Sequence, residues 1–142
     1  MPSDTFSHTV TITKDPVVVI AALEEVETWK GLGPIDKVWD ERVEKDRLTG
    51  FRWSARAAGR TFDGTADRVG DPGNGSMQLD LSSSDVTGTI TVDVAPDSSG
   101  STMTVAMTVR SNSLMAGVFW GPISDALRTG LPDQVESFAA QF

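Results

Sequence analysis

The stretch DVTGTITVDVAPDSSGSTMTVAMTV, residues 85–109, carries the clearest structural signal in the chain. Apolar residues recur at every second position in both of its halves, which is the period of a β-strand with one buried face. A short segment of Pro, Asp, Ser and Gly at 96–100 separates the two halves. Because parallel strands need a long crossover, so short a connection predicts an antiparallel hairpin.

The sequence pattern of strands and turns continues from this hairpin back toward the N-terminus. Strand-like segments alternate with turn signals at 49–50, 59–60, 71–75 and 83–85. The segments are IDKVWDERVEK (35–45), GFRWSARAA (50–58), RTFDGTADRV (60–69) and SMQLDLSSS (76–84), and a further alternating strand covers Phe6–Ile12. We therefore expect a seven-stranded antiparallel meander, with its first strand separated from the rest by another kind of structure.

That other structure, and the end of the chain, have the pattern of helices. Asp15 and Pro16 are suited to a helix start, and the VVVIAALEEVETW that follows (17–29) has an apolar face before GLGP ends it. From 114 to 142 a second apolar stripe includes Ile123 and Leu127. Pro122 and Pro132 interrupt this last helix, and each predicts a kink.

Length and composition exclude several classes of protein. We expect 142 residues to form one domain, 1–142. The net charge of −8 opposes binding to nucleic acid or to anionic membranes. The chain has no cysteine, hence no disulfide or thiolate metal site, and a lone histidine makes no conventional zinc site. The printed N-terminus resembles no signal peptide and no run is long enough to span a membrane, so we expect a cytoplasmic protein.

This order of elements resembles the helix-grip fold of the START-like, or SRPBCC, superfamily. The resembling segments are TKDPVVVIAALEEVETW (13–29), ADRVGDPGNGSMQLDL (66–81) and the hairpin at 85–109. The superfamily includes birch-pollen-allergen, lipid-transfer and polyketide cyclase-like proteins. The resemblance implies an α+β fold, in which a curved seven-stranded antiparallel sheet wraps around a long kinked C-terminal helix, with two short helices after the first strand.

The resemblance also implies a deep apolar cavity between the concave sheet and the last helix. The large apolar residues expected to line or close this cavity are Trp39, Phe51, Trp53, Phe62, Leu79, Leu81, Ile90, Val92, Met107, Phe119, Ile123 and Leu127. A small apolar or amphipathic ligand would bind there mainly by burial of apolar surface, oriented by one or two polar groups. A binding or transport protein is therefore the first functional hypothesis.

Few residues suggest catalysis. Glu41 shares the phase of Trp39 and would be an inward carboxylate with a raised pKa. Arg52 and Arg56 belong to the opposite, solvated face of their strand unless a bulge reverses it, and His8 is in phase with the first strand's apolar residues.

These four residues support a second hypothesis, an enzyme of the cyclase or dehydratase kind that uses acid and base groups without a cofactor. The sequence offers no metal or cofactor motif. A third hypothesis is a partner-protein module with a filled core. The sequence leaves the ligand and the oligomeric state open.

Overall fold

The computed structural model describes residues 3–142 apart from 31–34, 58, 71–74, 114–116 and 118–119. The described strands and helices are β1 (Ser3–Ile12), α1 (Pro16–Leu23), α2 (Val26–Trp29), β2 (Ile35–Glu44), β3 (Arg47–Ala57), β4 (Arg60–Arg68), β5 (Ser76–Ser83), β6 (Val86–Asp97), β7 (Gly100–Ser111) and α4 (Trp120–Ala139).

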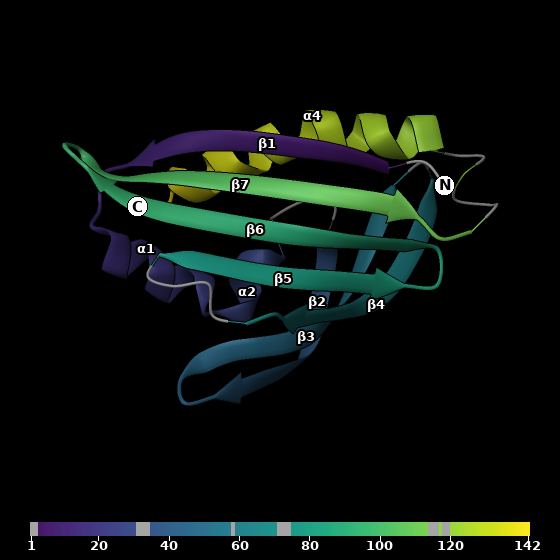
Figure 1. The fold of residues 1–142 in the computed structure, drawn as a ribbon, viewed down its shortest axis with the longest axis horizontal. Helices are drawn as coiled ribbons and strands as arrows, with labels where there is room; N and C mark the ends of the chain where they lie inside the picture. Colours follow the sequence, from purple (N-terminus) through teal and green to yellow (C-terminus); the bar gives the residue numbers. More distant parts are fainter. Residues whose placement is uncertain (1–2, 31–34, 58, 71–74, 114–116, 118–119) are drawn as a thin grey trace.

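The seven strands form one antiparallel sheet in the order β1-β7-β6-β5-β4-β3-β2. The first strand thus pairs with the last, and the hairpin that dominates the sequence, β6–β7, lies next to it (Figure 1). β2 and β1 are the two edges. This confirms the predicted meander with a displaced first strand.

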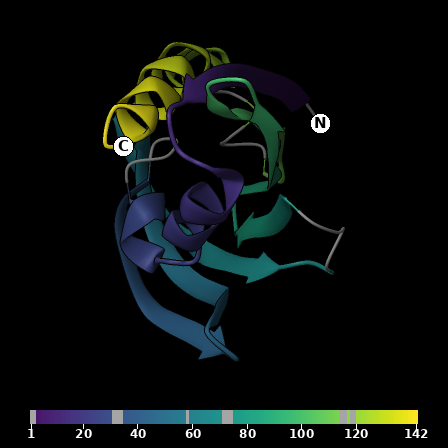
Figure 2. The same ribbon diagram turned by 90° about the vertical axis from the view of Figure 1, so that its left-hand side faces the viewer.

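The helices cover the concave side of the curled sheet. α4 runs alongside β1 and packs chiefly against it, while α1 and α2 close one end of the trough between α4 and strands β2–β4 (Figure 2). Trp29 at the end of α2 anchors this cap, because its indole N–H donates to the carbonyl oxygen of Leu23 at 3.0 Å and its ring stacks on Phe51.

The core follows the period-2 pattern of the strands. The intervening threonines of β6 and β7 are more exposed than the buried apolar residues, which are Ile90, Val92, Val94, Met103, Val105, Met107 and Val109. Side chains alternate between the two faces of a strand, so all of these apolar groups meet on the concave side. The curved antiparallel sheet and its helices confirm the predicted fold class.

The hairpin between β2 and β3 differs from the prediction. The sequence indicated a turn at Thr49-Gly50, but the turn lies at Lys45-Asp46, whose φ angles are 52° and 63°. Two successive positive φ angles are typical of the tight turn that matches the twist of a hairpin. Gly50 is instead inside β3, where an added Cβ would lie 2.2 Å from the guanidinium of Arg42 and 2.8 Å from the carbonyl oxygen of Ala66.

The last helix also departs from expectation at its start. α4 begins at Trp120, so Pro122 lies in its first turn, where a missing N–H costs no intrahelical bond. Only Pro132 interrupts the described helix, because it lacks the N–H that would bond the carbonyl of Arg128. Within the described residues, no helix is long and apolar enough to cross a bilayer.

Candidate functional site

A wholly apolar cavity lies between α4 and one end of the concave sheet. Its volume is about 60 Å³. It is lined by Ile35, Trp53, Ala55, Phe62, Leu81, Val86, Thr87, Gly88, Met107, Val109, Ile123 and Leu127. Six of the twelve residues predicted to surround a cavity are among them: Trp53, Phe62, Leu81, Met107, Ile123 and Leu127. Whether these residues bind a ligand stays a prediction.

One lining residue carries an unused hydrogen-bond donor. The indole of Trp53 lies against Gly64, where an added Cβ would be 2.5 Å from the ring. Its Nε1 is buried and has no hydrogen-bond partner among the described residues. Leaving such a donor unpaired costs about 1–3 kcal/mol. This donor does not open onto the cavity, because the exposed lining of the cavity is wholly apolar.

The middle of the concave face is filled by side chains. Leu79 of β5 pairs with Ile90 of β6, two residues along each strand from the pair Leu81–Gly88 that lines the cavity. The side chains of Leu79 and Ile90 are almost fully buried. Phe51 has no exposure and lies on β3 opposite Ala66, next inward from the cavity residue Trp53. These three residues were predicted to line a single deep cavity. They divide the interior instead, because large side chains from neighbouring strands meet there and leave no space.

A second and larger pocket, which we call the α1 pocket, lies beyond that filled row. It has a volume of about 390 Å³. It is lined by Val17, Ile20, Leu23, Glu24, Arg47, Arg68, Gly75, Ser76, Met77 and Val92. Val92, a predicted cavity residue, therefore belongs to this pocket and not to the cavity under α4. The expectation of one deep cavity is corrected to two separate spaces.

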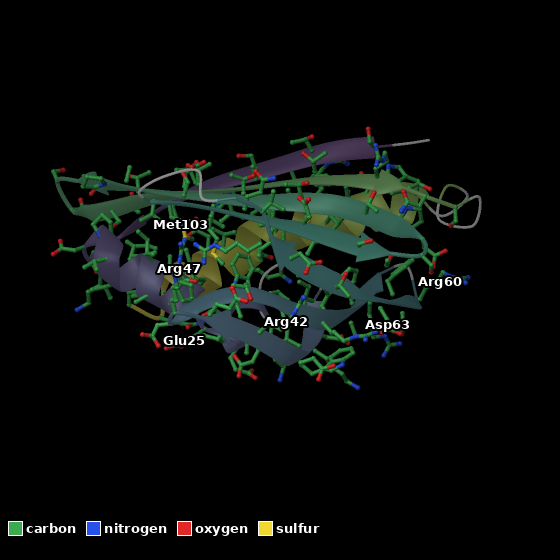
Figure 3. The ribbon with its side chains drawn as sticks, turned by 60° about the horizontal axis from the view of Figure 1, so that its bottom comes forward. Glu25, Arg42, Arg47, Arg60, Asp63 and Met103 are labelled. Carbon is green, nitrogen blue, oxygen red and sulfur yellow. The ribbon has the colours of Figure 1, made fainter. Side chains whose placement is uncertain are left out.

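The α1 pocket contains an ion-pair network. Glu24 Oε1 accepts from Arg68 Nη1 at 2.6 Å and from the backbone N–H of Leu48 at 3.0 Å, while Glu24 Oε2 lies 3.8 Å from Arg47 Nε. Arg68 also donates to the carbonyl oxygen of Leu48 at 3.3 Å. Its side chain is only 9% exposed and its Nε has no hydrogen-bond partner in the described chain. Figure 3 shows Arg47 at this end of the molecule.

Glu24 and Arg68 were not among the residues selected from the sequence. A signal for Arg68 existed, because it continues the inward phase of Phe62 and Ala66 along β4. The sequence contains no such signal for Glu24, because three glutamates follow one another closely after α1. Only the tertiary structure brings Glu24, and not the other two, to Arg68.

Trp39 and Glu41 are exposed and do not line the predicted site. The pairing of β2 with β3 shifts register between Ile35 and Lys37 and again after Trp39, where Asp40 has a φ of 53°. Such a bulge reverses the alternation of the side chains. Trp39 is consequently 40% exposed and Glu41 is exposed, so neither faces the apolar cavity.

The other catalytic candidates lie away from the cavity as well. Arg52 and Arg56 are exposed on the outer face of β3, as the alternation of that strand predicted. His8 Nε2 lies 2.9 Å from Glu136 Oε1 and so links β1 to α4. Phe119 lies outside the described residues. Among the described side chains, no group of three or more His, Cys, Asp and Glu could hold a metal ion.

Hydrogen bonds from Trp120 and Ser124 to Asp4, which we call the polar seam, fix the start of α4 to β1 beside the cavity. Asp4 Oδ2 accepts from the indole N–H of Trp120 at 2.8 Å and from the hydroxyl of Ser124 at 2.9 Å. The hydrogen bond from Trp120, followed by that from Ser124, lowers the pKa of Asp4, with a smaller contribution from Arg128 and partial opposition from burial. The Arg128 guanidinium lies 5.9 Å from the centre of the Phe6 ring.

Known structures share the overall fold of this chain. A START superfamily protein from Mycobacterium smegmatis superposes with a TM-score of 0.64 at 14% identity, over 89% of this chain and 96% of that one. The Zhui aromatase/cyclase from Streptomyces sp. R1128 gives 0.65 at 15% identity, over 99% and 86% of the two chains. The di-domain aromatase/cyclase BexL from the BE-7585A biosynthetic pathway gives 0.68 at 21%, over 97% of this chain and 48% of that one.

A comparison with protein-family models and with curated protein sequences finds no match. At such low identities the superpositions define the fold and nothing finer. The chain has the START-like, helix-grip fold, as the sequence resemblance predicted. Within that class it is similar in fold to START superfamily and aromatase/cyclase structures alike.

Proposed function

We propose that this protein binds a small hydrophobic or amphipathic molecule, such as a lipid, an isoprenoid or a polyketide-like compound, between the sheet and α4. The observation that carries the proposal is the wholly apolar cavity between α4 and the sheet. Apolar cavities remain dry, and apolar ligands enter them readily.

The size of the cavity requires the walls to move when a ligand enters. About 60 Å³ is well below the roughly 150 Å³ that accommodates benzene in an engineered protein cavity. Two features allow expansion. α4 packs chiefly along β1 and only slightly on β3, and Met107 has a flexible side chain that can change rotamer.

The cyclase or dehydratase alternative has less support. It requires acid and base groups that face the ligand. Glu41, Arg52 and Arg56 are exposed and do not line the cavity, and His8 is paired with Glu136. Two structures of similar fold are aromatase/cyclases, but at 21% and 15% identity the likeness extends to the fold alone, so we place binding ahead of catalysis for this chain.

The test is uptake of the apolar fluorophore N-phenyl-1-naphthylamine, together with native mass spectrometry of protein isolated gently from its host. Ala55→Leu places a larger side chain in the cavity wall, and we expect it to abolish uptake of the fluorophore. Ala106→Leu adds the same side chain to β7 at a position outside the buried set and is the matched control. No uptake by the wild-type protein, or equal uptake by both variants, contradicts the proposal.

A further inference from the structure

Strand β2 is an edge of the sheet and is exposed along most of its length. From Asp36 to Glu44 every residue is exposed except Val38, which is half-buried. Trp39 is 40% exposed and Val43 is 52% exposed, so two large apolar side chains of one strand lie in water. Figures 1 and 2 show the β2–β3 hairpin projecting on the side of the molecule away from α4. A free strand edge with exposed apolar groups is a template for pairing with another strand.

A bulge in β2 decides which of its residues share a face. Trp39 pairs with Arg52 of β3 and Arg42 pairs with Gly50, so three steps along β2 match two steps along β3. Residues two apart on a strand point to the same face, and directly paired residues of neighbouring strands do so as well. Trp39 and Arg42 therefore lie on one face. Without the bulge they would lie on opposite faces.

This arrangement of faces makes β2 complementary to a second copy of itself. Val38 and Val43, the next residues outward from the bulge, share the opposite face, and Lys37 and Glu44 beyond them return to the first. A two-fold axis between two identical antiparallel strands places each residue opposite one that lies on the same face and equally far from the axis. An axis at the bulge meets this condition on both of its sides.

We propose that two copies of this chain associate by antiparallel pairing of their β2 edges, about an axis between Asp40 and Glu41. Each interstrand pair then occurs twice. The pairs are Lys37 with Glu44, Val38 with Val43, and Trp39 with Arg42. Opposite charges and apolar side chains directly across from each other stabilise a sheet, and the backbone of both edges gains hydrogen bonds. The indole of Trp39 covers the aliphatic part of Arg42, whose guanidinium stays on Asp67 of its own chain.

The charges of β2 favour a copy of the same chain as the partner. Among the described residues neither Lys37 nor Glu44 has an ion-pair partner, so both charges are available to another molecule. A strand whose charges complement its own reversed sequence fits itself better than it fits an arbitrary edge strand. Asp40 and Glu41 are the exception, because like charges meet at the axis and oppose association. We therefore expect a weak, reversible dimer.

The first test is sedimentation equilibrium of the full chain up to about 1 mM, which detects weak association. Lys37→Glu should weaken the dimer about tenfold, because each of two symmetric pairs loses an attraction and gains a repulsion. Lys37→Glu/Glu44→Lys exchanges the signs and should restore the dissociation constant of the wild type. The matched control is Lys14→Glu, which makes the same charge change at an exposed residue outside β2 and should have a much smaller effect.

The second test reads the register of the two strands. The chain has no cysteine, so introduced thiols are the only ones present. Val38→Cys chains labelled with ¹⁵N are mixed with unlabelled Val43→Cys chains and oxidised gently, and mass spectrometry separates the three disulfide products. The mixed product should dominate, because the Cβ atoms of directly opposed residues are about 4.5–5.5 Å apart and a disulfide can bridge them.

A wild-type protein that stays monomeric at every concentration, a double variant that associates no more tightly than K37E, or equal yields of the three disulfides would each overturn the inference. Asp40→Asn/Glu41→Gln should tighten the dimer, since it removes like charges from the axis, and a weaker dimer would also contradict the proposed register. The outcome is independent of the proposed function. Residues 36–44 do not line the cavity under α4, so each of these variants should take up N-phenyl-1-naphthylamine as the wild type does.

Discussion

Replacing Leu127 by alanine should destabilise the protein and at the same time create a site for a small apolar molecule. Leu127 is 5% exposed and lines the cavity under α4. Removing three carbons from water-excluded surroundings costs roughly 2.4 kcal/mol in transfer free energy. The enlarged cavity adds about 24 cal/mol for each Å³ that the walls fail to fill.

The walls around Leu127 can close this space only in part. Strands β3 to β7 of the cavity wall are hydrogen-bonded on both sides, and the polar seam at Asp4 fixes the start of α4. We therefore expect a loss of about 3–4 kcal/mol in the free energy of unfolding. In urea, with a slope of about 2 kcal/mol/M, the midpoint should fall by roughly 1.5–2 M while the slope stays the same.

The enlarged cavity joins the existing space of about 60 Å³ and approaches the size that holds benzene. Benzene at ten times its dissociation constant should then restore about 1.4 kcal/mol of stability. The matched control is Leu131→Ala, which makes the same chemical change one turn further along α4, at a residue that is 1% exposed and does not line the cavity. Stabilisation of both variants by benzene, or a loss below about 1 kcal/mol in L127A, would refute the reasoning.

Three further predictions concern the stability of the fold and are checked by chemical or thermal unfolding. Gly64→Ala should lower the free energy of unfolding by about 1–3 kcal/mol and reduce fluorophore uptake. The new Cβ would lie 2.2 Å from the carbonyl oxygen of Ser82 and 2.5 Å from the indole of Trp53 beside the cavity. The control Gly121→Ala has open space around it and should leave the stability unchanged. The pKa of Asp4 is lowered in the folded protein, so its contribution to stability is complete above the ordinary value of about 3.8 and is lost as the pH falls through the folded pKa. Asp4→Asn should therefore be less stable than the wild type at pH 7 and nearly equal to it in strong acid, and an unchanged difference would contradict this account. Glu24→Ala should cost about 3–5 kcal/mol because it leaves Arg68 buried without its partner, whereas Glu24→Leu/Arg68→Met should recover most of that loss, and equal stabilities of the two variants would be inconsistent with a buried pair.

The sequence predicted the strands where local rules act alone. The alternation in β6 and β7 and the short turn between them depend only on residues close in the chain, so the hairpin was predictable from its own sequence. The prediction failed in the β2–β3 hairpin. There the bulge near Asp40 and the passage of the Arg42 guanidinium over Gly50 to the carbonyl of Ala66 reset the alternation. That interaction joins residues on three strands, and no local pattern contains it.

By itself, the sequence determined which side chains would be buried together, because alternation assigns each apolar residue of a regular strand to one face of the sheet. It did not determine where that face is filled and where it is hollow. Leu79 meets Ile90 and closes the middle, while Gly88 and Ala55 leave room beneath α4. Glu24 reaches Arg68 only because α1 folds back over the end of the sheet. Empty volume and ion pairing depend on which distant residues meet, and only the tertiary structure decides that.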